Sequence, residues 1–200
     1  ENAEFRLLVA DRVHRHFHNQ GVLTPKAILT QFEKRKNEIE KAVVCESARW
    51  GDAQESTGGF MAPPRFGPDG KPETGPLTKE HWLREIQRLT NDYFPKRTAV
   101  VLGQLWDLGL WPDTEAPAFS QDGSRLEMKA PRGQILYTLD GSDPRLIGGK
   151  ISPQAITYRG PLPLSKRVVA KARVLLDQDW SPLNEAELSL SRFVERPNSD

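Results

Sequence analysis

Residues 134–144 restrict the fold of this chain more than any other segment. Apolar side chains occur there at every second position, a period that indicates a strand and not a helix: Ile135, Tyr137 and Leu139. The Asp-Gly pair that follows supplies the positive-φ residue that a hairpin turn needs, and the Asp-Pro pair after it stops further strand pairing. The segment therefore predicts a β-strand that runs into a tight turn.

The rest of the second half has the same strand pattern. Short segments separated by Gly, Pro and Asp predict strands at residues 116–120, 125–129, 134–139, 156–158, 168–176 and 186–190. In the longest of them, Val168, Ala170, Ala172 and Val174 alternate with Lys171 and Arg173, so one face should be buried and the other exposed. Strands of this number and spacing predict an immunoglobulin- or fibronectin-III-like antiparallel β-sandwich over residues 113–195, followed by a tail at 196–200.

The sandwich region also carries a family resemblance. It rests on four segments in order: YTLDGSDP (137–144), YRGPLPL (158–164), VVAKAR (168–173) and WSP (180–182). Together they resemble the small β-sandwich module at the C-terminus of chitobiases and β-hexosaminidases, over about residues 113–193. The resemblance implies a sandwich module and carries no activity with it.

Apolar residues recur at helical spacing in much of residues 1–112, where we expect about four helices. The first runs from about residue 3 to residue 18, and the second begins with Thr24 as its N-cap and ends near Trp50. Thr78 caps the third, Pro95 separates it from the fourth, and Gly109 ends the fourth. Residues 51–77 are rich in Gly and Pro, which predicts an irregular insert. The fold class is therefore α+β with two domains, a helical domain at 1–112 and the sandwich.

The helical half has a resemblance of its own, carried by EFRLLVADRV (4–13), LTP (23–25), ESARW (46–50) and NDYFPKRT (91–98). These segments resemble the C-terminal helical portion of CotH-type proteins, the spore coat protein H-like relatives of kinases. The resemblance covers most of residues 1–112 and only the tail of that family's domain. It implies that the nucleotide-binding and catalytic parts lie upstream, so no kinase residue can be assigned to this chain.

The charge balance excludes a general attraction to nucleic acid. The chain has 28 Lys and Arg against 27 Asp and Glu, and the balance holds on both sides of Asp113, with 16 basic and 15 acidic residues before it and 12 of each from it onward. No apolar segment is long enough for a membrane span. The single cysteine, Cys45, excludes an internal disulfide, and its apolar neighbours predict a buried, inert thiol.

Two polar motifs carry residue types that can bind metal ions, but we expect no metal, no cofactor and no catalytic residue. His14 and His18 share a helix face at a spacing of four, but Arg15 stands where a zincin motif needs Glu, so ordinary packing is favoured. Asp140 and Asp143 provide fewer oxygen ligands than a calcium loop requires. The preferred explanation of that motif is that the side chains of Asp140 and Ser142 accept hydrogen bonds from turn amides.

Three aromatic residues are the candidate interaction sites. Tyr137 and Trp180 could form a platform for sugar rings, and the alternative is that both fill the small sandwich core. Exposure on one flat face would favour the platform, and burial would count against it. Trp111, next to the expected boundary, is the candidate residue for joining the two domains.

The preferred interpretation is a non-catalytic accessory or interaction region of a larger bacterial envelope or secreted protein. The chain starts at Glu1 with helical periodicity almost at once, which we interpret as a fragment of a longer polypeptide. The upstream part of that polypeptide is the expected partner, and a polysaccharide or another envelope protein is a further candidate. One alternative is a carbohydrate-binding module. The other is the end of a kinase-like enzyme, which predicts an exposed apolar patch on the first helix.

Overall fold

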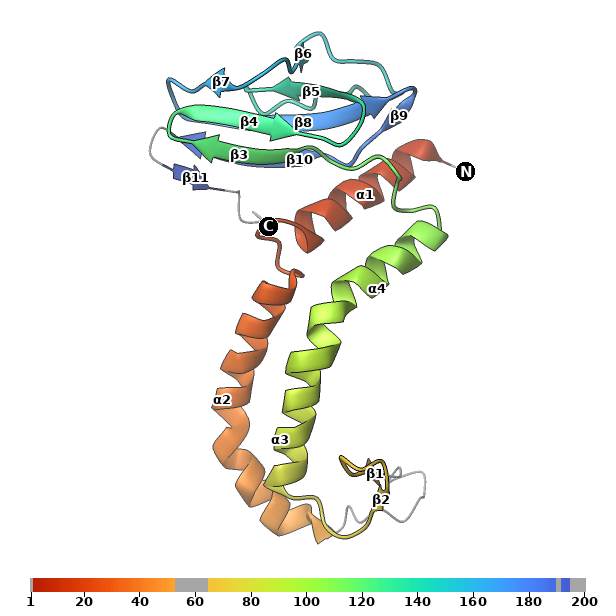
Figure 1. Cartoon of the computed structure of the whole chain (residues 1–200), viewed down its shortest axis with the longest axis vertical. Helices are drawn as coiled ribbons and strands as arrows, with labels where there is room; N and C mark the ends of the chain where they lie inside the picture. Colours follow the sequence, from red (N-terminus) through yellow and green to blue (C-terminus); the bar gives the residue numbers. More distant parts are fainter. Residues whose placement is uncertain (1, 53–64, 190–191, 195–200) are drawn as a thin grey trace. The chain divides into compact units, whose positions relative to one another are not determined.

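The computed structural model describes residues 2–52, 65–189 and 192–194 (Figure 1). Its contacts form two compact units, one made of residues 1–27 together with 98–200 and the other of residues 28–97. This division differs from the boundary expected after residue 112, because the first helix packs on the strands. The proposed tail at 196–200 lies outside the described residues.

The first unit contains an antiparallel β-sandwich, so the predicted fold class is confirmed. The larger sheet has the strand order β11-β10-β8-β5-β6, with β9 paired to β8, and the smaller has the order β3-β4-β7. The two sheets form two layers (Figure 1). Their strands are β3 (Ala118–Asp122), β4 (Arg125–Lys129), β5 (Gln134–Thr138), β6 (Ile156–Thr157), β7 (Leu162–Pro163), β8 (Val168–Leu176), β9 (Asp179–Trp180), β10 (Asn184–Ser189) and β11 (Arg192–Val194).

The sandwich core follows the two-residue period of the strands. In β8 the alternate residues Val168, Ala170, Ala172 and Val174 are buried, as the sequence predicts. Ile135 and Tyr137 of β5 lie opposite Val174 and Ala172 in the register, on the same side of the sheet. The small residues of β8 and β10 let side chains from the smaller sheet approach, and Leu126 and Met128 of β4 complete the cluster.

The opposite face of β8 was expected to be exposed, and that expectation is wrong at Arg173. This arginine is only 2% exposed, because helix α1 (Ala3–Phe17) covers it. Asn2 caps the helix, its side chain accepting hydrogen bonds from the amides of Glu4 and Phe5. At the other end Gly21 is required, because a Cβ there would lie 2.3 Å from the carbonyl oxygen of His16.

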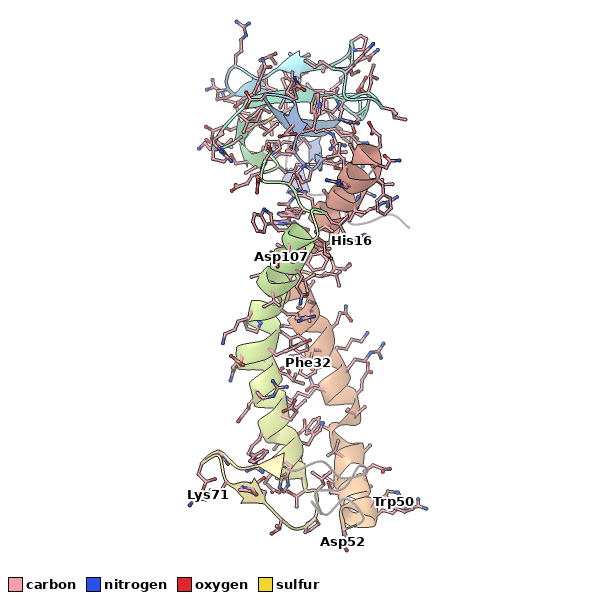
Figure 2. All side chains as sticks on the ribbon, turned by 90° about the vertical axis from the view of Figure 1, so that its right-hand side faces the viewer. His16, Phe32, Trp50, Asp52, Lys71 and Asp107 are labelled. Atoms are coloured by element: carbon pink, nitrogen blue, oxygen red, sulfur yellow. The ribbon has the colours of Figure 1, made fainter. Side chains whose placement is uncertain are left out.

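The second unit is helical, with a small hairpin. It holds most of α2 (Pro25–Trp50), together with α3 (Lys79–Arg88), the π-helical turn η2 (Leu89–Tyr93) and the start of α4 (Phe94–Asp107). Phe32 of α2, labelled in Figure 2, lies in this unit. It meets Phe94 edge to face, with 4.8 Å between the ring centroids. Pro95 does not separate two helices as predicted. The π-helical turn accommodates it instead, and α3 runs into α4 without a break.

Helix ends in this unit follow the sequence signals more closely. Pro25 is the first residue of α2, and the Thr24 hydroxyl accepts a hydrogen bond from the amide of Ala27. Thr78 begins α3 in a capping box with His81. Within the predicted insert, residues 65–73 form a hairpin of β1 (Arg65–Phe66) and β2 (Pro72–Glu73), while residues 53–64 lie outside the described residues.

The structure describes every residue of α2, α3, η2 and α4, and none of these residues is buried. The predicted burial of Cys45 on α2 is therefore wrong, and this thiol is exposed. Trp50, at the end of the same helix, is 51% exposed (Figure 2). None of the described helices is both long and apolar enough to cross a bilayer.

Candidate functional site

The two residues predicted for a glycan platform are both buried. Tyr137 is 5% exposed and lies in the sandwich core, where its ring meets that of Tyr158 edge to face. Burial raises the pKa of its hydroxyl. Trp180 is 7% exposed, and its indole N–H donates to the carbonyl of Gly149 over 3.0 Å. Burial counts against the candidate glycan platform and favours the alternative, that both rings fill the sandwich core.

The acidic turn after β5 is stabilised by hydrogen bonds to the Asp140 side chain, in agreement with the preferred structural explanation. Asp140 Oδ1 accepts hydrogen bonds from the amide and the hydroxyl of Ser142, at 2.9 and 2.6 Å. The hydrogen bond from the Ser142 hydroxyl has the largest effect on the pKa of Asp140 and lowers it. The hydrogen bond from the Ser142 amide lowers it further. Asp143 is directed instead to Arg173 and to the amide of Arg145. The two carboxylates therefore have separate partners.

Arg173 of β8 is the centre of a polar cluster between α1 and the sandwich. Its Nε and Nη2 donate to Asp143 at 2.9 and 2.7 Å, and Nη1 and Nη2 donate to Asp11 of α1 at 2.7 Å each. Nη1 also donates to the carbonyl of Ser181. A guanidinium has five N–H groups, so each one has an acceptor here. We call Asp11, Asp143 and Arg173 the arginine cluster.

Hydrogen bonds within the arginine cluster favour the charged forms of Arg173 and Asp143. Burial acts to lower the pKa of Arg173, but the hydrogen bonds to Asp143 and Asp11 outweigh it and raise that pKa above its ordinary value. Burial likewise acts to raise the pKa of Asp143, and the hydrogen bonds from Arg173 hold it below its ordinary value. A buried charge that lost these partners would be costly, so the cluster requires α1 to stay docked.

A second ion pair ties the start of α1 to the loop after β5. Arg145 donates to both carboxylate oxygens of Glu4, at 2.8 and 2.7 Å, and the amide of Gly148 donates to Glu4 at 2.8 Å. The hydrogen bonds from Arg145 and then Gly148 lower the pKa of Glu4 to about 2. Glu4 and Asp11 are seven positions apart, about two helical turns, so one face of α1 carries both contacts.

Two histidines near the end of α1 take part in ring stacking. His14 stacks on His18 at 4.8 Å between centroids, and His18 stacks on Trp111 at 5.4 Å. Burial lowers the pKa of His14 to about 4, and burial also lowers the pKa of His18. Trp111 thus joins the end of α1 to the segment that leads into the sandwich. In the part of the chain that the structure describes, no group of three or more His, Cys, Asp or Glu residues is placed to hold a metal ion.

A cleft of about 500 Å³ lies in the first unit beside these contacts. Three tryptophans from different segments line it: Trp106 at the end of α4, Trp111, and Trp180 of β9. Residues of α1, among them Arg6, Leu7 and Ala10, line it too. We call it the tryptophan cleft. It brings Trp180 and Trp111 together, whereas Tyr137 is not among its lining residues.

Sequence reasoning missed Arg173, Asp11, Glu4 and Trp106 as important positions. In β8, Arg173 stands at a position where alternation predicts an exposed side chain. Asp11 and Glu4 belong to the polar side of a helix, where acidic residues are ordinary. One sequence signal could have indicated these contacts. Asp143 and Arg145 lie in or next to the turn motif, and charged residues close to a sandwich core need partners of opposite charge.

Comparison with known protein families finds one match, in the sandwich region. Residues 125–181 match the family described as Fn3 associated, a fibronectin-III-associated module. The match begins at β4 and ends just after β9, so it lies wholly within the sandwich. No match was found among curated proteins or solved structures. The family suggests an accessory module.

Proposed function

We propose that this chain is a non-catalytic accessory region of a larger bacterial envelope or secreted protein, in which the sandwich holds the preceding helix in a fixed position. The match to the Fn3 associated family supports an accessory module. The resemblances to the chitobiase C-terminal module and to the end of CotH-type proteins suggest the finer assignment. They also suggest the location, outside the cell or in its envelope.

The observation that carries the proposal is the arginine cluster. A module joined to its neighbour by a flexible linker needs no buried ion pair with the chain that precedes it. Here Asp11 of α1 satisfies two of the five N–H groups of a buried guanidinium, and it also accepts the amide of Leu183 at 2.8 Å. The orientation of α1 on the sandwich is therefore specified by directional contacts.

The outer face of α1 offers a surface for the upstream polypeptide. Phe5 and Leu8, three positions apart and so on one side of the helix, are each more than half exposed. An exposed apolar patch on the first helix is also what the kinase-like alternative predicts. Under that second candidate function, the patch contacts an upstream catalytic domain, and the sandwich supports that contact.

Amide hydrogen exchange on the whole chain tests the accessory role. We expect the amides of α1 to be protected to a degree similar to those of β8, because both belong to one compact unit. In the double variant Glu4→Gln, Asp11→Asn the protection of α1 should fall further than that of β8. Rapid exchange of α1 in the unmodified chain would contradict the proposal, as would turnover of ATP or of chromogenic glycosides.

A further inference from the structure

We propose that the tryptophan cleft binds one hexose unit of a neutral polysaccharide. Its volume of about 500 Å³ lies within the range of small-molecule sites, about 300–1,000 Å³. Carbohydrate recognition goes beyond the accessory role. It rests on that role in one respect, because the docked helix α1 supplies part of the wall through Arg6, Leu7 and Ala10.

Trp106 provides the stacking surface that Tyr137 and Trp180 do not. Its side chain is 55% exposed, and its indole N–H donates to Asp113 Oδ1 at 2.6 Å. The one polar group of the indole is therefore satisfied, and the remaining exposed surface is apolar ring. A pyranose presents C–H groups on one face, which pack against such a ring. Because the hydrogen bond holds the ring in place, little conformational freedom is lost on binding.

The rim of the cleft supplies polar groups for sugar hydroxyls. Gln178, in the turn between β8 and β9, and Asp179, the first residue of β9, are both exposed and both line the cleft. An amide donates and accepts hydrogen bonds, and a carboxylate accepts them. An apolar wall with a few polar groups at its edge is the usual composition of a site that orients a small polar ligand.

The charges around the cleft favour a neutral ligand over an acidic sugar. Arg145 lines the cleft, but Glu4 accepts two hydrogen bonds from its guanidinium, so its charge is compensated. The other cation in the lining, Arg6, is accompanied by the carboxylates of Asp113 and Asp179. A site for a uronate or a phosphorylated sugar would carry an excess of positive charge.

Retention of the whole chain on insoluble cellulose and chitin, both neutral polysaccharides, tests the proposal. We expect retention on at least one of them, and a loss of affinity of about tenfold or more in Trp106→Ala, as is typical of an aromatic anchor. Trp106→Phe should keep most of the affinity, because it keeps a ring. Trp50→Ala is the matched control, since Trp50 is 51% exposed but belongs to the second unit.

Hydrogen exchange of α1 in the same variants separates this proposal from the accessory role. We expect α1 to stay protected in Trp106→Ala, because the Trp106 indole N–H donates to Asp113 and the contacts that hold α1 are made by Asp11 and Glu4. No retention on either polysaccharide would overturn the proposal and leave the accessory role intact. Equal losses in Trp106→Ala and Trp50→Ala would also overturn it, as would retention of a proline-rich peptide in place of the polysaccharides.

Discussion

Asp11 and Arg173 stand 162 positions apart in the sequence and are joined by two hydrogen bonds of 2.7 Å each. The pair connects the first helix to the longest strand of the sandwich, and residues 28–97, which lie between them along the chain, form the other compact unit. Folding of the first unit therefore requires contact between two distant parts of the sequence. The arginine cluster stabilises that contact once it has formed.

Replacing Asp11 by Ala should lower the free energy of unfolding of the first unit by about 3 kcal/mol, the cost of removing one partner from a buried ion pair. Two N–H groups of Arg173 would lose their acceptor, in a side chain that is 2% exposed. The amide of Leu183 would lose its acceptor as well. Urea unfolding followed by circular dichroism measures the change.

Glu38→Ala is the control for this variant. Glu38 accepts a hydrogen bond from Arg35 on α2, with both side chains largely exposed, and such pairs contribute about 0.5 kcal/mol or less. Equal effects of the two substitutions would show that the arginine cluster adds nothing beyond an ordinary surface pair.

The unfolding free energy should fall as the pH is lowered from 6.5 towards 4, because of His14. Burial lowers the pKa of His14 to about 4 in the folded chain, whereas the unfolded chain takes up the proton near the ordinary value of 6.5. Between these values only the unfolded state is protonated, so the free energy of unfolding decreases as the pH falls, by roughly 3 kcal/mol in all. Below pH 4 this contribution no longer changes.

Comparison with His14→Phe isolates this contribution. The phenyl ring can still stack on His18, while the titrating group and its hydrogen bond with the backbone of Leu183 are removed. We expect a lower stability at neutral pH and a flatter dependence between pH 6.5 and 4, where His18, whose pKa burial also lowers, still contributes to the slope. An unchanged slope would mean that His14 does not titrate in this range.

The sandwich could be predicted from the sequence because its information is local. Alternation in residues 168–176 defines the buried face of β8, and the Asp-Gly pair after β5 defines a turn without any knowledge of distant residues. The same holds for helix ends, where Gly109 adopts a φ of +66° after α4 as predicted. The strands β7 and β9, each two residues long, are too short to show a period.

The docking of α1 could not be predicted, because it depends on pairs of residues far apart in the sequence. Nothing local distinguishes Arg173 from Lys171, its neighbour on the same face of β8, yet one is buried under α1. The roles of the aromatic residues were difficult to predict from the sequence for the same reason. Tyr137 and Trp180 are large rings at strand positions, and only the packed structure shows that both are buried.

The carboxyl group of Glu4 should titrate near pH 2. The hydrogen bonds from Arg145 and the amide of Gly148 lower its pKa to about 2, from an ordinary value of 4.5. The stability that Glu4 contributes is therefore fully present above pH 4.5 and is lost as the pH falls through 2. NMR titration of the side-chain carboxyl measures this midpoint directly.

Arg145→Gln should move the midpoint of Glu4 towards 4.5, since the largest cause of the shift is removed. Glu40 is the internal control. Its pKa is lowered mainly by a hydrogen bond from Lys79 in the second unit, so its titration should be the same in both proteins. A midpoint near 4.5 for Glu4 in the unmodified chain would contradict the ion pair that joins α1 to the loop after β5.

Gly133→Ala should destabilise the sandwich far more than Gly123→Ala. Both glycines have positive φ, +80° and +55°, so an alanine at either one is expected to cost about 1 to 2 kcal/mol for the left-handed backbone. At Gly133 the new Cβ would also lie 2.6 Å from Val174 Cγ1 and 2.8 Å from the carbonyl oxygen of Leu175, whereas at Gly123 nothing lies within 4 Å. We expect about 1 to 3 kcal/mol more loss at Gly133, as for overpacking of a core. Urea unfolding of the two variants side by side measures the difference, and equal losses would mean that the turn before β5 can move away from β8.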